Sequence, residues 1–263
     1  MQWIHAIDWL AILSGFGIGL IVGVTGVGGG SLMTPLLISV FHLDKAVAIG
    51  TDLWFAGLTK VSGSWAHYRH GHVDYRIVAL LLGGSIPASI ATTAYMHTIG
   101  MSKQADSTLS YALGIALVLT AVTIIFRPVW YRVGLYLERW ITPSRQTWLT
   151  VLCGLILGVL VSLSSIGAGA LGATMILMLY PRLSTVRLVG SDIAHAVPLT
   201  IVAGIGHATL GNVHWALLLE LLVGSVPAIW LGARLTKVLP DLFTRMALCV
   251  SLLFAARKIL LSV

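Results

Sequence analysis

Charged side chains are scarce in this sequence. Aspartate, glutamate, lysine and arginine make up 10% of its 263 residues, whereas 57% are hydrophobic. A soluble globular domain has about 25% charged residues, so the composition excludes an ordinary soluble protein. The mean hydropathy of +0.95 instead predicts an all-α polytopic membrane protein without a separate soluble domain.

Cysteine is equally rare. Cys153 and Cys249 both lie in apolar stretches, so the sequence does not support a disulfide framework and we expect both to pack as small apolar side chains. The net charge of +7 would suggest nucleic-acid binding in a soluble protein. Here the basic residues fall in connecting loops, where they set membrane orientation, so we expect the lipid bilayer as a partner and no nucleic acid.

Motifs for catalysis and metal binding are missing as well. There is no HExxH, paired catalytic carboxylates or nucleophile elbow. The glycine run at 28–31 has no lysine before its serine, unlike a phosphate loop, and the histidines at 67–72 lack a set of carboxylates or thiolates. We therefore predict no enzyme, no cofactor and no metal site.

Glycine, in contrast, is abundant in one apolar region. Residues 19–35, GLIVGVTGVGGGSLMTP, carry no charge and contain a run of glycines. Glycine costs about 1 kcal/mol in a helix interior, and backbone groups freed in lipid must find partners or face a water-filled cavity. The pattern predicts a transmembrane segment broken near its middle beside a binding cavity.

The break occurs twice. A shift of 139 to 140 positions aligns the two copies, as shown by Gly19, Gly28, Gly30 and Leu32 over Gly158, Gly167, Gly169 and Leu171, Gly50-Thr51-Asp52 over Gly190-Ser191-Asp192, His67 over His207, and GSIPA at 84–88 over GSVPA at 224–228. Paired broken segments in corresponding halves indicate the substrate site of a secondary transporter. We predict a first membrane repeat at 1–126, a linker at 127–147 and a second repeat at 148–263.

Two apolar segments are too short to span a membrane. Residues 32–41 and 171–180 would each rise about 15 Å as a helix, about half of a ~30 Å hydrocarbon core. Each repeat is thus predicted to hold a glycine-broken half-helix or re-entrant hairpin plus three long transmembrane helices. Whether 8–24 and 32–41 cross the membrane or re-enter it stays open.

The loop charges predict an orientation. If the spans alternate, one side collects Arg69, Arg76, Arg127, Arg132, Arg139, Arg145, Arg182, Arg187, Arg234 and Lys237, and the other side only Lys45, Lys103, Arg257 and Lys258. The basic side is expected to be cytoplasmic, with both termini periplasmic. Each half then crosses an odd number of times, which makes the repeats inverted. Aromatic and basic residues in 127–147 predict an interfacial helix.

The half-helix starts are the expected anion site. They would direct free backbone N–H groups and positive dipole ends toward the midplane. The predicted substrate-binding residues near them are Thr25, Gly26, Gly28, Gly29, Gly30 and Ser31 in the first copy, and Ser164, Ser165, Gly167 and Gly169 in the second. The alternative is that these glycines only permit close helix packing.

Polar residues inside the spans add candidates, because a charge at the membrane centre costs at least ~2.5 kcal/mol. The repeat mates Thr51-Asp52 and Ser191-Asp192 belong either to the substrate site or to a shared structural cap. Lys60 is expected to neutralise the anion, or else to be a lysine that reaches the interface.

Two further side chains are candidates for proton coupling. His195 lies one helical turn from Asp192, a spacing that lets the side chains meet, and histidine titrates near physiological pH. Glu220 could relay a proton. Both also fit a structural role as buried hydrogen-bonding residues.

These motifs together resemble the sulfite exporter TauE/SafE family, also called the toluene sulfonate uptake permease family. The resemblance rests on GVGGGSLMTPLL, the GTD and GSD motifs, SGSWAHYRHGHVDYR and the duplicated GSxPA, and it covers nearly the whole chain. It implies an inverted-repeat fold in the bacterial inner membrane that moves a small sulfur-containing anion such as sulfite, thiosulfate or an organosulfonate.

The resemblance leaves the anion, the direction, the coupling ion and the oligomeric state open. In the second copy Ala168 and Thr174 replace Gly29 and Pro35, and Thr200 stands opposite Lys60, so a site dominated by the first half is expected. The alternatives are an intramembrane enzyme, in which Asp192, His195 and Glu220 would act, and a non-transporting membrane scaffold.

Overall fold

The structure is a computed structural model that describes residues 8–25, 30–99, 103–235 and 241–260. Within these ranges every regular element is an α-helix: α1 (Trp9–Thr25), α2 (Gly30–Ser39), α3 (Lys45–Arg69), α4 (Tyr75–Ile99), α5 (Lys103–Ile125), α6 (Arg127–Leu137), α7 (Pro143–Ser164), α8 (Ala170–Leu179), α9 (Thr185–Thr209), α10 (Trp215–Leu235) and α11 (Asp241–Leu260). The prediction of an all-α protein is confirmed.

Five helices in the described part are long and apolar enough to cross a membrane: Tyr75–Ile99, Ser107–Ile125, Pro143–Ser164, Thr185–Thr209 and Trp215–Gly232. Their outer surfaces carry exposed apolar side chains such as Ile90, Leu155 and Val223. Exposed apolar surface of this kind suits contact with lipid. The α3 helix has 25 residues, as many as α4 and α9, but the charged residues Asp52 and Lys60 lie in the middle of its sequence.

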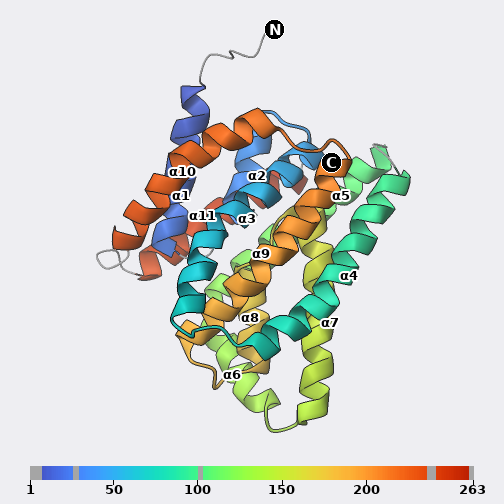
Figure 1. Cartoon of the computed structure of the whole chain (residues 1–263), viewed down its shortest axis with the longest axis vertical. Helices are drawn as coiled ribbons and strands as arrows, with labels where there is room; N and C mark the ends of the chain where they lie inside the picture. The colour runs from blue at the N-terminus through green and yellow to red at the C-terminus, as the bar shows by residue number, and fades with distance from the viewer. Residues whose placement is uncertain (1–7, 26–29, 100–102, 236–240, 261–263) are drawn as a thin grey trace.

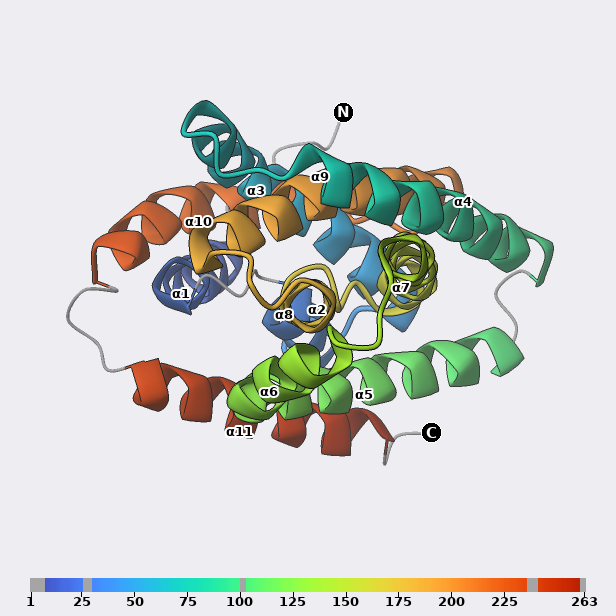
Figure 2. The ribbon, with the colours of Figure 1, turned by 90° about the horizontal axis from the view of Figure 1, so that it is seen from below.

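Two half-length helices lie at the centre. The α2 and α8 helices have 10 residues each, as the short apolar segments predict. In Figure 1 α2 lies in the upper part of the molecule and α8 in the lower part. In Figure 2, seen from below, the two overlap in the middle and the long helices surround them.

The α7 and α8 helices form a hairpin. Near the start of α7, the Gln146 side-chain amide donates a hydrogen bond of 2.6 Å to the carbonyl of Leu179 at the end of α8. One turn further, the hydroxyls of Thr150 and Tyr180 lie 2.8 Å apart. Because the end of α8 returns to the start of α7, this pair is a hairpin and not one kinked helix.

Glycines on α1 and α7 allow close helix packing between the halves. The α1 helix packs along α10, and α7 packs along α4. A Cβ added to Gly19 of α1 would lie 2.6 Å from the carbonyl oxygen of Ser225. A Cβ on its repeat mate Gly158 of α7 would lie 2.9 Å from the Cα of Ser85. For these two glycines of the aligned motif, the packing interpretation is therefore the correct one.

Two helices cover the region of the expected 127–147 linker. The α6 helix ends at Leu137, and α7 begins at Pro143, a residue suited to the first turn because its missing N–H has no helical partner there. The last residues of the expected 127–147 linker thus belong to α7. Gly134 of α6 packs on the backbone of α8, and α6 lies on the face that is viewed in Figure 2.

Candidate functional site

The backbone between α7 and α8 is unwound. Ser165 is left-handed with φ of 58°, and Gly167 and Gly169 have φ of 119° and 153°. L-amino acids rarely adopt such angles, whereas glycine does so freely. A Cβ on Gly167 would meet Leu171, Val161 and Leu157 at ordinary distances of 3.4 to 3.7 Å. Gly167 is therefore required for its backbone angle and not for the space beside it.

No described side chain caps the start of α8. Gly169 occupies the N-cap position and provides no side-chain hydrogen bond. The first N–H groups of a helix have no intrahelical partner, and Gly172 and Ala173 already donate to the carbonyls of Gly167 and Gly169. The helix start presents the positive end of its dipole, as an anion site requires.

The first break is described only in part. Gly26, Gly28 and Gly29 lie outside the described residues, as do the side chain of Thr25 and the surroundings of Gly30. Ser31, in the first turn of α2, is 7% exposed, and its hydroxyl has no hydrogen-bond partner among the described groups. It is thus a buried donor at the start of α2.

Asp52 connects α3 with both breaks. Its carboxylate is fully buried and accepts a hydrogen bond from the hydroxyl of Thr34 on α2. The Ser165 hydroxyl in the second break lies beside the same carboxylate. Asp52 Oδ1 and Ser165 Oγ both lack a hydrogen bond of normal geometry in the described part of the chain. Of these two groups only the Ser165 hydroxyl is a donor, and it is available either to Asp52 or to a ligand.

Ser164 differs from its neighbour. Its hydroxyl donates a 2.6 Å hydrogen bond to the Leu160 carbonyl within α7 and accepts one from the Ile166 N–H at 3.2 Å. Because both interactions are local, Ser164 shapes the end of α7 and has less capacity left for a ligand than Ser165.

Lys60 lies two turns beyond Asp52 on α3. Its amine donates a hydrogen bond to the carbonyl of Ala168 in the second break. The same amine interacts electrostatically with Asp52 and with Asp192. A lysine from the first half is thus directed at the unwound backbone of the second half.

Asp192 on α9 faces α8. Its side chain is 5% exposed, and a Cβ added to Gly172 of α8 would overlap Asp192 Oδ1. That oxygen has no hydrogen-bond partner among the described residues. Asp192 therefore has a close backbone neighbour in Gly172 and an electrostatic partner in Lys60, but its Oδ1 accepts no hydrogen bond from the described residues.

His195 is fully buried one turn from Asp192. Its hydrogen bond goes to α4, where Ser85 Oγ lies 3.0 Å from His195 Nε2. His195 Nδ1 has no partner within the described structure. The spacing that permits contact with Asp192 is present, but the imidazole forms its hydrogen bond with Ser85.

Glu220 lies outside the polar cluster, by which we mean the set formed by Thr34, Asp52, Lys60, Ser85, Ser165, the Ala168 carbonyl, Asp192 and His195. Its carboxylate accepts a 3.3 Å hydrogen bond from the backbone N–H of Asp8, directly before α1. The first break follows the other end of α1, a helix of 17 residues and hence about 25 Å long. In the structure Glu220 stabilises a helix start far from the break.

Thr51 in the first half and Ser191 in the second half have the same role. The Thr51 hydroxyl accepts a 3.0 Å hydrogen bond from the N–H of His214, before α10. The Ser191 hydroxyl accepts a 2.8 Å hydrogen bond from the N–H of Asp74, before α4. Both hydroxyls thus hold a loop of the opposite half.

The neighbouring glycines of the GTD and GSD motifs complete these contacts. A Cβ on Gly50 would overlap the Asn212 carbonyl, and a Cβ on Gly190 would overlap that of His72. Of each motif, the glycine and the hydroxyl hold a loop, and only the aspartate belongs to the polar cluster.

Sequence reasoning did not find three contributors to the cluster: Thr34, the Ala168 carbonyl and Ser85. Thr34 belongs to the same GGGSLMTP motif as Ser31, and Ser85 belongs to the duplicated GSxPA motif. The presence of Thr34 and Ser85 in these motifs was the sequence signal that could have identified them. No sequence pattern indicates a backbone carbonyl as the partner of a lysine.

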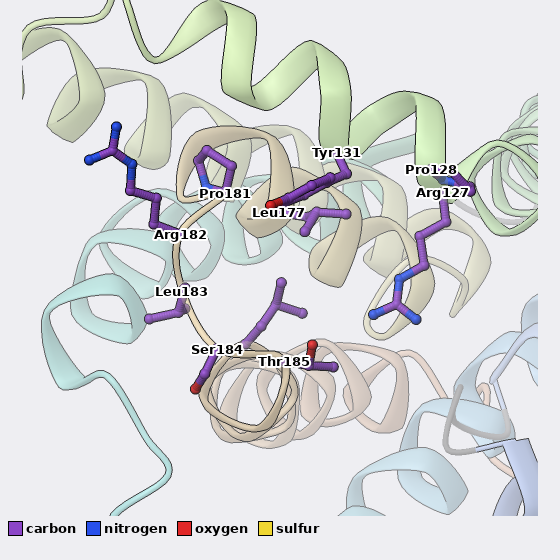
Figure 3. A pocket seen from close by; sticks show the side chains of 10 residues that line it. Arg127, Pro128, Tyr131, Leu177, Pro181, Arg182, Leu183, Ser184 and Thr185 are labelled. Atoms are coloured by element: carbon purple, nitrogen blue, oxygen red, sulfur yellow. The ribbon is translucent and has the colours of Figure 1, made fainter.

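A separate surface cavity of about 610 Å³ lies between α6, the end of α8 and the start of α9. Figure 3 shows Arg127 and Tyr131 of α6 opposite Ser184 and Thr185, while the Arg182 side chain extends away. Arg182 pairs with Glu138 at 3.1 Å on the surface. The cavity is at the opposite end of α8 from the break and is not the predicted site. Among the described residues no group of three or more His, Cys, Asp or Glu side chains could hold a metal ion.

Two half-length helices inside a multi-pass bundle, with buried carboxylates and a lysine where one of them begins, define a polytopic membrane protein of the transporter class. The chain belongs to the sulfite exporter TauE/SafE family, whose profile matches residues 11–259. It is a membrane transporter of that family.

Two curated relatives are similar over nearly their full length. The probable membrane transporter protein YjnA of Bacillus subtilis (strain 168) is 36% identical over 86% of this chain and 89% of its own. The probable membrane transporter protein YdhB of the same organism is 30% identical over 91% of this chain and 94% of its own. No solved structure matches the chain.

Proposed function

We propose that this protein is a secondary transporter of a small sulfur-containing anion, namely sulfite, thiosulfate or an organosulfonate, which binds where α2 and α8 begin. The observation that carries the proposal is the contact of Lys60 with the Ala168 carbonyl directly before α8. It places a cation beside an uncapped helix start, and both favour a bound anion.

Buried hydroxyls supply further donors. Ser31 and Ser165 are 7% and 2% exposed, and neither hydroxyl has a partner among the described groups. A buried hydroxyl without a hydrogen bond is costly, and an anion with several oxygens would satisfy both. The proposed cradle consists of these serines, Lys60 and the backbone around Gly30 and Gly167 to Gly169.

We also propose that the halves form inverted repeats. The support for inversion is the distribution of basic residues in the loops, which gives each half an odd number of crossings. A two-fold relation between the halves is supported by the paired contacts of α1 with α10 and α7 with α4, and of Thr51 with His214 and Ser191 with Asp74. Each contact joins one half to the other. In its repeat mate the two halves exchange roles. In this arrangement the basic loops and 127–147 face the cytoplasm, and both termini face the periplasm of a bacterial inner membrane.

Family membership favours transport over the two alternatives. Both relatives are named as membrane transporters, and neither an intramembrane enzyme nor a scaffold explains two half-length helices with a lysine directed at one break. No catalytic role is assigned to any residue.

The test is anion binding by the purified protein, measured as ligand-dependent melting temperature, because only a bound ligand stabilises by mass action. Sulfite, thiosulfate, sulfate and an organosulfonate are compared with chloride. The result expected is stabilisation by at least one sulfur anion and not by chloride, with matching currents on a solid-supported membrane. Stabilisation by none of them would contradict the proposal.

A matched pair of serine variants tests the location. Ser165→Ala is expected to weaken anion binding by about tenfold, since a hydrogen bond to a charged group contributes about 1.5 to 3 kcal/mol. Ser164→Ala is the control, because the Ser164 hydroxyl is bonded within its own helix end. Equal effects of the two substitutions would place the anion elsewhere.

A further inference from the structure

The polar cluster has more negative than positive side chains. Asp52 and Asp192 both belong to the cluster, and one lysine, Lys60, interacts electrostatically with both of them. With both carboxylates ionised the three groups sum to one negative charge before any substrate enters. An anion would add to that charge in a membrane interior, where uncompensated charge is costly. A mechanism for anion binding therefore needs a way to remove negative charge from the protein.

The two carboxylates are not equivalent. Asp52 accepts a hydrogen bond from the Thr34 hydroxyl, and such a donor stabilises an ionised carboxylate. Asp192 faces Gly172, which offers no side chain, and its Oδ1 has no partner among the described residues. Asp192 is therefore the carboxylate with less compensation for its charge.

The elements around Asp192 offer few other charges. From α3, Lys60 interacts electrostatically with it, and His67 Nδ1 would lie 3.1 Å from a Cβ added to Gly190, two residues before Asp192. The α8 helix, with the sequence ALGATMILML, has no titratable side chain. On α9 itself His195 is bonded to Ser85 of α4, and Arg187 pairs with Asp74 at 3.3 Å near the helix start. On α7 Cys153 packs against the apolar core.

We propose that Asp192 takes up a proton when the anion binds, so that a proton accompanies the anion through the cycle. Protonation removes one negative charge from the cluster. It also turns a carboxylate, which only accepts hydrogen bonds, into a group with an O–H donor, which the anion's oxygens can use. The inference rests on the proposed anion transport and names Asp192, not His195 or Glu220, as the coupling residue.

The experiment measures thiosulfate binding and transport by the full-length protein in detergent and in proteoliposomes. Thiosulfate is the probe because its charge, unlike that of sulfite, stays constant over the pH range used. For the wild type, affinity is expected to fall by up to about tenfold per pH unit as Asp192 loses its proton, the limit for one linked proton. An inward proton gradient is expected to drive accumulation.

Asp192→Asn mimics the protonated state. It is expected to bind thiosulfate with an affinity that changes less than about twofold between about pH 5.5 and 8, to retain counterflow exchange, and to lose accumulation driven by the proton gradient. Asp192→Glu keeps the titrating group and is expected to retain the pH dependence. Because the Asn variant must still bind and exchange, a misfolded protein cannot produce this result.

The neighbouring groups provide the controls. Asp52→Asn and His195→Gln are expected to alter affinity while leaving the pH dependence in place. A pH dependence that survives in Asp192→Asn, or is lost in His195→Gln, overturns the assignment. If the wild type binds thiosulfate without pH dependence, proton coupling fails and anion transport stands. If the wild type binds no sulfur anion at any pH, both proposals fail.

Discussion

At the scale of single residues, Lys60 connects the two halves. Its carbon chain runs from α3, and its amine reaches the backbone before α8. A lysine carries three donors on a flexible stem, so it can hold the Ala168 carbonyl and still donate to a ligand. The Lys60 ammonium is thus held at the break by the Ala168 carbonyl, which carries no charge and leaves the positive charge of the lysine in place.

Replacing Lys60 by methionine removes this cation but keeps most of the apolar side chain. We expect the variant to lose more than about tenfold in anion affinity. Its melting temperature without anion is expected to fall, because the buried carboxylates of Asp52 and Asp192 lose their cation. The measurement is anion-dependent melting temperature of purified protein. Lys60→Arg keeps the charge and is expected to retain part of the binding; unchanged affinity in Lys60→Met would show that the lysine is only structural.

The sequence predicts the polar residues of the cluster better than their partners. Asp52, Lys60 and Asp192 stand out because charges are rare in apolar spans. Their partners come from tertiary contacts: Thr34 for Asp52, a backbone carbonyl for Lys60, and Ser85 for His195. Helical spacing shows which residues share a face of one helix, but not which neighbouring helix that face meets.

At the scale of elements, the break before α8 depends on backbone angles that an ordinary residue avoids. Gly167 and Gly169 have positive φ, and α8 starts directly after them. These two angles let the chain turn back within the bundle, so that the short helix begins among the polar side chains.

Gly167→Ala is expected to lower the free energy of unfolding by about 1 to 3 kcal/mol, the cost of a strained backbone position. Space is not the cause, because a Cβ there meets only ordinary contacts. Unfolding is measured as the loss of monodisperse protein on heating. Gly63→Ala in α3 is the control, since a Cβ at Gly63 would meet nothing within 4 Å. Equal melting temperatures of the two variants would contradict the argument.

Packing of α1 on α10 depends on a different kind of glycine. Gly19→Val is expected to destabilise the protein by about 1 to 3 kcal/mol through overpacking, because the added side chain would meet the Ser225 backbone. Gly17→Val on the same helix is the matched control, since Gly17 has open space. The same heating assay checks both; a harmless Gly19→Val would mean that α1 and α10 can separate without loss.

The half-length helices follow from the sequence because their length and the glycines before them are both visible in it. The distinction between the two classes of glycine does not. Gly19 and Gly158 align as well as Gly28 and Gly167 do, yet they lie within α1 and α7 and serve packing. A repeat shows that a glycine matters in both copies. The sequence alone does not show whether that glycine is needed for close packing of two helices or for a positive φ, because this depends on the structure around it.

At the scale of the whole molecule, the bundle is built from pairs that each take one helix from either half. In Figure 2 α1 and α10 lie together at one side, and α4 and α7 lie together at the other, with α2 and α8 between them. A substrate held by the central helices would therefore be enclosed by both halves at once, as alternating access about a fixed site requires.

The orientation of this bundle is testable with single cysteines. In a background with Cys153 and Cys249 replaced by alanine, cysteines at Arg69, Arg139 and Arg182 are expected to be shielded from an impermeant thiol reagent in intact cells, because basic loops stay in the cytoplasm. A cysteine at Lys103 is expected to react. Permeabilised cells serve as the control for reactivity, and labelling of Arg139→Cys from outside would reverse the topology.

The crossed contacts of Thr51 and Ser191 also set an order of biosynthesis. The ribosome completes the first half before the second exists. The Asp74 N–H therefore has no Ser191 to donate to until α9 is inserted. In the same way, α3 and α4 lack their packing partners until α9 and α7 are inserted. Neither half can reach its final fold as an isolated domain, and maturation ends only when α11, which follows α10 in the chain, has packed against α5. A chain truncated at the linker would expose these unmatched surfaces in the bilayer, which makes it a substrate for membrane quality control, whereas two co-expressed halves carry all the contacts needed to assemble.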